Sequence, residues 1–230
     1  MIRFVRPGGF LLILSLLLIT PVPAATTFEG TEIERVLSRL SEEQTKIQTL
    51  QASFRQEKTV GLLAGTEVST GTFIFSRPNR ALWTYDQPKR VDMLVADGWM
   101  TTYYPDLRRA ERIEIKKYED RIFRYLGAGT GAIGDLDAFF EFQLVDTSNS
   151  PTYRLELTPR SRRIAKRVKQ IKVWIDRKSY LTTAFEYQEA DGDLTRYEFS
   201  AVKVNRPLPD SKFELSLPSS VRVETMAGSR

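Results

Sequence analysis

Apolar side chains between residues 33 and 47 recur at helical spacing, with polar side chains between them. The apolar members of this series are Ile33, Val36, Leu37, Leu40 and Ile47. Thr31 and Glu34 have the spacing of a capping box, in which a hydroxyl and a carboxylate satisfy free backbone N–H groups. This pattern predicts an amphipathic helix from about Thr31 to Lys46, whose apolar stripe covers another part of the fold.

Beyond the predicted helix, apolar and polar residues alternate, which is the pattern of strands. Asp97-Gly98 and Asp191-Gly192 separate such runs and are typical of hairpin turns. The predicted strands span 50–55, 67–76, 81–86, 90–96, 99–104, 108–115, 142–145, 152–157, 168–176, 181–188, 194–202 and 220–224. Many short strands and few helices predict a mainly β domain, either a barrel or a strongly curved antiparallel sheet.

A different pattern interrupts the strands between residues 118 and 140. Tyr118 to Leu126 and Asp135 to Phe140 each have the pattern of a short helix, and the segment 127–134 between them is rich in glycine. Residues 129–134 match G-x-G-x-x-G, which binds nucleotides only between a strand and a crossover helix. Helix-like residues precede the match here, so we interpret it as a flexible loop or as a hinge between two short helices.

The first 25 residues have the pattern of a secretory signal peptide. Arg3 and Arg6 precede an apolar run from Phe10 to Ile19, and small residues around Ala24 offer a cleavage site. A membrane anchor would need about 20 apolar residues, and this run is half that length. We therefore expect cleavage near residue 25, a single domain over 26–230 with a disordered tail from 225 to 230, and a location in the bacterial periplasm.

The amino-acid composition limits the classes of function that are open to the chain. The chain has no histidine and no cysteine, which excludes Ser-His-Asp and Cys-His catalysis and zinc sites built on those residues. Catalysis by carboxylates alone stays open, but we expect no enzymatic activity, no cofactor and no metal. Without Arg3 and Arg6 the chain has 32 basic and 29 acidic side chains, too mild an excess to favour nucleic acid as a partner.

Several segments resemble a known family. The most specific is 71–88, where a strand led by Gly71 is followed by Arg77-Pro78, a turn, an aromatic strand with Trp83, and Pro88. The supporting segments are 95–98, 103–107, 155–159, 171–176 and 213–221. Through these residues the chain resembles the periplasmic outer-membrane lipoprotein carrier family, LolA.

The resemblance implies a half-open, curved antiparallel β-barrel that encloses a hydrophobic cavity covered by short helices acting as a lid. It also implies a non-enzymatic carrier that takes acylated lipoproteins from an inner-membrane ABC transporter to an outer-membrane lipoprotein receptor. The lack of cysteine favours the soluble carrier over the lipid-anchored receptor. Because the lid region is rich in glycine and lacks an expected proline, two alternatives stay open: a carrier of another lipid or glycolipid, and a lipid-sensing adaptor.

The alternation and the resemblance together select candidate residues. The expected cavity residues are Phe73, Phe75, Trp83, Tyr85, Met93, Val95 and Trp99, for which ordinary core packing is the alternative. The expected lid residues are Phe123, Leu126, Phe139 and Phe140. The resemblance makes Arg77 a latch that bonds lid carbonyls, against a solvated turn arginine. Arg162, Arg163 and Arg167 form a possible docking patch, against a solvated hairpin loop.

Overall fold

The computed structural model describes residues 31–61, 65–118, 134–145 and 149–226. Twelve strands form one sheet in the spatial order β12-β6-β5-β4-β3-β2-β1-β11-β10-β9-β8-β7. The strands are β1 (Thr49–Thr59), β2 (Thr66–Ser76), β3 (Arg80–Gln87), β4 (Val91–Ala96), β5 (Trp99–Tyr104), β6 (Arg109–Glu114), β7 (Phe140–Val145), β8 (Thr152–Pro159), β9 (Val168–Asp176), β10 (Thr182–Glu189), β11 (Leu194–Val204) and β12 (Arg222–Met226). The helices are α2 (Glu32–Thr45), α4 (Arg162–Ala165), and the short 3-10 helices η1 (Pro105–Leu107), η2 (Lys116–Tyr118), η3 (Gly134–Ala138) and η4 (Asp210–Phe213).

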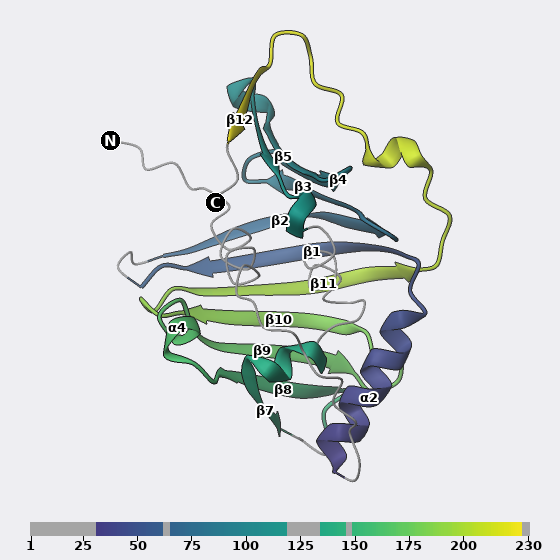
Figure 1. Ribbon diagram of the computed structural model, residues 1–230, viewed down its shortest axis with the longest axis vertical. Coiled ribbons are helices and arrows are strands. Elements are labelled where there is room, and N and C mark those ends of the chain that lie inside the picture. The colour runs from purple at the N-terminus through teal and green to yellow at the C-terminus, as the bar shows by residue number, and fades with distance from the viewer. Residues whose placement is uncertain (1–30, 62–64, 119–133, 146–148, 227–230) are drawn as a thin grey trace.

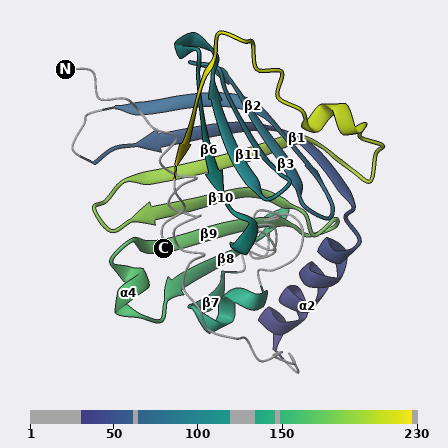
Figure 2. The same cartoon turned by 45° about the horizontal axis from the view of Figure 1, so that its top comes forward.

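The sheet is a strongly curved, half-open layer, which confirms the fold class (Figure 1). Strands β2 to β6 curl over relative to β8 to β10, and Figure 2 shows β6 crossing in front of the middle of the sheet. Consecutive strands pair as antiparallel neighbours on both sides of the β1–β11 junction. Because β1 pairs with both β2 and β11, the first strand joins the two halves of the chain.

Helix α2 begins as the capping box predicts. The Thr31 backbone N–H donates to Glu34 Oε2 at 2.6 Å, and the Glu34 N–H donates to Thr31 Oγ1 at 3.4 Å. Its buried side chains are Val36, Leu37, Leu40 and Gln44. The predicted helix is confirmed, and its buried stripe faces the sheet.

The sheet needs special backbone residues at two places, one in a turn and one within a strand. Asp97 and Gly98, with φ of 53° and 75°, both adopt the left-handed conformation that a tight hairpin between β4 and β5 requires. Gly71 is needed for a different reason. A Cβ atom there would lie 2.0 Å from the Thr84 carbonyl oxygen on β3 and 2.8 Å from Phe54 Cζ, so only glycine lets these strands approach.

Strand β12 departs from the antiparallel pattern, because it pairs with β6 in parallel and Arg222 lies opposite Arg109. The chain leaves β11 in the middle of the sheet and returns at its far edge (Figure 1). Arg80 holds the crossing segment, with Nη1 2.7 Å from Asp210 Oδ1 and its guanidinium over the buried ring of Phe213. Residues 225 and 226 belong to β12, which corrects the expectation of a disordered tail from 225 onward.

The region between β6 and β7 differs from its predicted form. Most of the expected helix from Tyr118 to Leu126, and the glycine-rich match up to residue 133, lie outside the described residues. The expected helix from Asp135 to Phe140 is the shorter η3, and Phe140 is instead the first residue of β7. Pairing with Pro159 on β8 draws Phe140 into the sheet.

The two faces of the sheet differ in chemistry. Side chains alternate between faces along each strand, and ion pairs cross neighbouring strands on one face. Lys172 Nζ lies 3.3 Å from Glu186 Oε1, and Arg196 Nη1 lies 3.6 Å from Glu186 Oε2. We call this polar face the outer face, and the opposite one, against which α2 packs, the inner face.

Candidate functional site

The centre of the inner face is a large apolar cluster contributed by strands from both halves of the chain. Its buried members are Ile47, Leu50, Ala52, Phe54, Phe73, Phe75, Ala81, Trp83, Tyr85, Met93, Val95, Met100, Ile115, Tyr187 and Tyr197. Cross-strand register brings them together: Phe73 lies opposite Trp83, and Trp83 lies opposite Met93. The ring centroids of Phe73 and Trp83 lie 4.4 Å apart. Six of the seven expected cavity residues therefore share one cluster.

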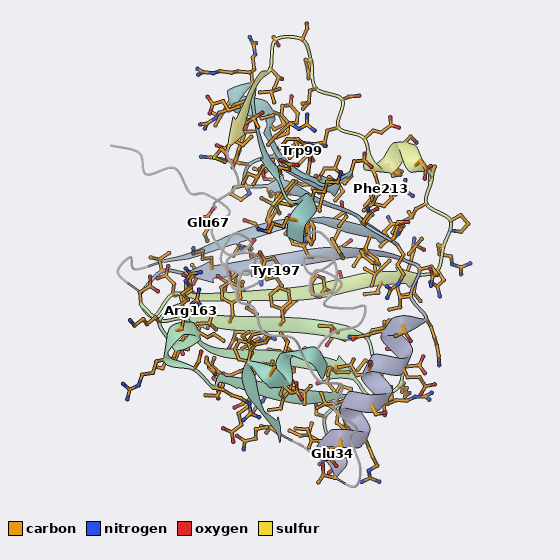
Figure 3. The ribbon with its side chains drawn as sticks, in the orientation of Figure 1. Glu34, Glu67, Trp99, Arg163, Tyr197 and Phe213 are labelled. Carbon is orange, nitrogen blue, oxygen red and sulfur yellow. The ribbon has the colours of Figure 1, made fainter. Side chains whose placement is uncertain are left out.

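Trp99 is the exception, and its expected place beside Trp83 is wrong. On β5 the inner face carries Met100, which pairs with Val95 and Ile113. Trp99 is the adjacent residue, so its side chain points to the outer face. There the Arg112 guanidinium lies 4.6 Å from the centre of its ring, and Figure 3 shows Trp99 far from Tyr197.

A second apolar cluster lies where α2 covers the inner face. Its buried members are Leu37, Leu40, Phe140, Leu155, Leu157, Ile164, Val173 and Ile175. The partly buried side chains of Ile171 and Phe185 pack against both clusters. The two clusters therefore form one continuous apolar surface along the inner face, and α2 covers one end of it.

Part of this surface keeps contact with solvent. Apolar side chains that pack on the central cluster but stay only partly buried are Val91, Ile113, Ile171, Leu181, Phe185, Phe199, Val202 and Val204. Partly exposed apolar groups that pack on a buried apolar cluster are suited to binding an apolar ligand. The inner face is thus the candidate binding site.

Strands β10 and β11 contribute aromatic residues that the sequence analysis did not select. Phe185 stacks on Tyr197 with ring centres 4.6 Å apart and lies 5.9 Å from the ring of Phe199. The available signal was an aromatic–Glu–aromatic triplet in each strand, at 185–187 and 197–199. Alternation places both aromatic residues of each triplet on one face.

The tyrosine hydroxyls are buried within this surface. Those of Tyr85 and Tyr197 lie 3.2 Å apart, within hydrogen-bond distance. Burial raises the pKa of Tyr85 to about 12, and burial also raises the pKa of Tyr187 and Tyr197 above the ordinary value. These side chains are therefore neutral hydroxyls at physiological pH.

Arg77 lies at the end of β2, close to the start of β1. Its Nε donates to the Ile47 carbonyl oxygen at 2.8 Å, and its backbone N–H donates to the Gln48 carbonyl oxygen at 2.9 Å. The described side-chain bond therefore reaches the junction between α2 and β1. The expected bonds from Arg77 to carbonyls of segment 118–140 stay a prediction, since residues 119–133 lie outside the described residues.

The remaining expected residues are those of the lid and of the docking patch. Phe123 and Leu126 lie outside the described residues, whereas Phe139 packs on the second cluster and Phe140 is fully buried within it. Arg162, Arg163 and Arg167 are exposed on and just after α4. Figure 3 shows Arg163 at one end of the sheet. The expected loop there is a helical turn, capped by Ser161 and anchored by the buried Ile164.

Sequences of known description match most of the chain. The family described as "Outer membrane lipoprotein carrier protein LolA" matches residues 45–216. An outer-membrane lipoprotein carrier protein of Cupriavidus taiwanensis is 29% identical over 187 residues, covering 78% of this chain and 82% of the relative. A protein of the same description from Pseudomonas fluorescens is 26% identical over 212 residues, covering 90% and 96%.

Solved structures show the same fold. An uncharacterized conserved protein from Thermus thermophilus superposes with a TM-score of 0.56 at 8% identity, covering 85% of this chain and all of that one. MucB superposes with a TM-score of 0.51 at 14% identity, covering 85% of this chain and 66% of that one. The family match spans most of the sequence, and the chain therefore belongs to the LolA family of outer-membrane lipoprotein carrier proteins.

Proposed function

We propose that this protein carries acylated lipoproteins through the periplasm and shelters their acyl chains on the inner face of the sheet. It receives its cargo from an inner-membrane ABC transporter and delivers it to an outer-membrane lipoprotein receptor. The observation that carries the proposal is the continuous apolar inner face with partly exposed side chains packed against its buried clusters. The relatives described as outer-membrane lipoprotein carrier proteins support the choice of cargo.

The need for such a surface follows from the cost of exposing hydrocarbon to water. Each exposed CH₂ group costs about 0.8 kcal/mol, so several acyl chains could not cross an aqueous compartment bare. A curved sheet provides a surface that can wrap around chains, while its outer face stays polar. Binding without catalysis also agrees with a chain that has no histidine and no cysteine.

The signal-peptide pattern of the first 25 residues supports a periplasmic location. Among the described residues, no helix has the length and apolar character needed to cross a bilayer. N-terminal sequencing of exported protein should find a mature chain that starts near Ala25 or Thr26. Membrane-retained protein that still begins at Met1 would contradict this location.

Tryptophan fluorescence tests the binding site, because the chain has only three tryptophans. Trp83 belongs to the central inner-face cluster, whereas Trp99 and Trp174 stack under arginines on the outer face. Addition of a triacylated lipopeptide should change the emission of Trp83. The response should survive in Trp99→Phe and Trp174→Phe and disappear in Trp83→Phe, and Trp83→Ala should weaken binding. No binding of the lipopeptide to the wild type would refute the proposal.

A further inference from the structure

Along three adjacent strands, the side chains on the inner face change in the same direction from apolar to polar and charged. The inner side chains of β1 run from Leu50, Ala52 and Phe54 to Gln56 and then Lys58. Register places Phe54 opposite Phe199, Gln56 opposite Tyr197, and Lys58 opposite Thr195 on β11. On β10 the same order is Phe185, Tyr187 and Glu189. The face is therefore apolar at one end, carries amide and hydroxyl groups next, and ends in charges.

The middle zone holds a band of hydroxyl groups, which belong to Tyr85, Tyr187, Thr195 and Tyr197. Figure 3 shows Tyr197 near the centre of the sheet. Tyr85 and Tyr197 are paired with each other. Tyr187 and Thr195 are cross-strand partners with exposed fractions of 2% and 0%. Burial raises the pKa of Tyr187, and the neighbouring Thr195 hydroxyl opposes the rise. Yet neither hydroxyl oxygen has a partner at hydrogen-bond geometry in the described part of the chain.

The far zone is charged. Lys58 Nζ lies 4.0 Å from Asp193 Oδ2, and both side chains are largely buried. Glu189 faces the same zone, where burial raises its pKa and Lys58 lowers it. A polar group beside the Tyr187–Thr195 pair would therefore meet Lys58, which lies opposite Thr195, and Asp193 next to it.

An unpaired hydroxyl in an apolar surface favours a ligand that supplies the missing acceptor. An acyl carbonyl is such an acceptor, and it brings no donor that would itself need a partner. In an acylated lipid the alkyl chain lies on one side of this carbonyl and the polar group on the other. That order matches the apolar zone, the hydroxyl band and the charged zone of the inner face.

We propose that the Tyr187 and Thr195 hydroxyls bind the carbonyl oxygen of an ester- or amide-linked acyl chain and so fix the direction in which the chain lies. The alkyl part then extends over Phe185 and Phe199 toward Leu50, and the polar group points to Lys58 and Asp193. This inference rests on the proposed carrier function. It adds a requirement for the acyl linkage, which an apolar surface alone would not impose.

Two ligands with the same chain and headgroup test the requirement. 1-Monomyristoylglycerol contains an ester carbonyl, whereas 1-O-tetradecylglycerol has an ether in its place. The wild type should bind the ester about three- to tenfold more tightly, which is the range expected for one net hydrogen bond. Tyr187→Phe and Thr195→Val together should remove this preference, so that the double variant binds the ester and the ether with equal affinity.

A matched control is Tyr103→Phe, which removes a hydroxyl from the outer face of β5 and should keep the preference. Equal binding of ester and ether by the wild type would overturn the inference, as would a preference that survives in the double variant. Equal binding is also the result expected if an ordered water satisfies both hydroxyls. If neither ligand binds at all, the carrier function itself fails.

A readout without ligand separates recognition from a structural role. Removing a buried hydroxyl that has no partner should leave the melting temperature of the empty protein unchanged or raise it. Tyr187→Phe should therefore be at least as stable as the wild type. A clear fall in melting temperature would show that the hydroxyl serves the fold, and the inference would be wrong.

Discussion

Arg77 Nε donates a 2.8 Å hydrogen bond to the carbonyl oxygen of Ile47. Ile47 lies between α2 and β1, and Arg77 directly follows β2. The arginine therefore ties the β2–β3 hairpin to the junction that carries α2, the helix that packs on the inner face. The bond therefore restrains the connection between α2 and β1.

Arg77→Leu should loosen the junction and add apolar surface at the edge of the inner face. A hydrogen bond with a charged donor contributes about 1.5–3 kcal/mol, so the free energy of unfolding should fall by up to that amount. Bound lipopeptide should be released more slowly, because closing no longer restores the lost bond. Urea denaturation and the rate of transfer to an acceptor membrane measure the two effects.

Arg77→Lys serves as the control, since it keeps the charge but loses the planar fork of donors. We expect an intermediate release rate. If the leucine variant released its cargo at the wild-type rate, the latch role of Arg77 would be wrong, and its bond to Ile47 would serve only the fold.

Gly71→Ala should destabilise the sheet, because the new Cβ would lie 2.0 Å from the Thr84 carbonyl oxygen. Forced overpacking costs about 1–3 kcal/mol, and backbone atoms cannot swing aside as a side chain can. Gly65→Ala is the matched control, since its Cβ would meet nothing within 4 Å. Thermal unfolding of both variants should show a loss for Gly71→Ala only, and equal melting temperatures would contradict the close approach.

Charge reversal at Arg162, Arg163 and Arg167 should slow delivery of cargo, because an exposed basic patch acts on the rate of encounter with an acidic partner. We expect transfer to be about tenfold slower at low salt and the difference to shrink as salt is added. The affinity for lipopeptide should not change. Lys203→Glu, exposed on the outer face of β11, is the control for a charge reversal outside the patch, to be compared with each single reversal within it. An unchanged rate of cargo transfer in the triple variant would show that these arginines are only a solvated surface and have no docking role.

Glu189→Gln should stabilise the protein at neutral pH. Burial raises the pKa of Glu189 above its ordinary value, so the folded state holds this proton more tightly than the unfolded chain does. When Glu189 is ionised in both the folded and the unfolded protein, the buried charge lowers the stability of the folded wild type. This loss of stability disappears as the pH falls below the ordinary glutamate range.

The gain should be less than about 1 kcal/mol, because the carboxylate is partly solvated. Urea denaturation at several pH values measures it, with Glu141→Gln, an exposed residue on β7, as the control. A stability difference that stayed the same at low pH would show that the substitution acts through packing instead.

Local chemistry was enough to predict much of this protein. The capping box of Thr31 and Glu34, the Asp97-Gly98 hairpin and the alternation of Phe73 and Phe75 depend on residues close together in the chain. Such patterns predicted the helix, the strands and six members of the apolar cluster. The segment around Gly71 and Trp83 also indicated the family.

Tertiary structure decided which face of each strand turns inward. Alternation divides a strand into two sets but does not say which one is covered, and on β5 pairing with Val95 chose Met100 over Trp99. Pairing between segments distant in sequence also placed Gln56 beside Tyr197 and set β12 parallel to β6. These contacts depend on cross-strand register and on the curvature of the whole sheet, whereas local sequence patterns report only which residues can share a face.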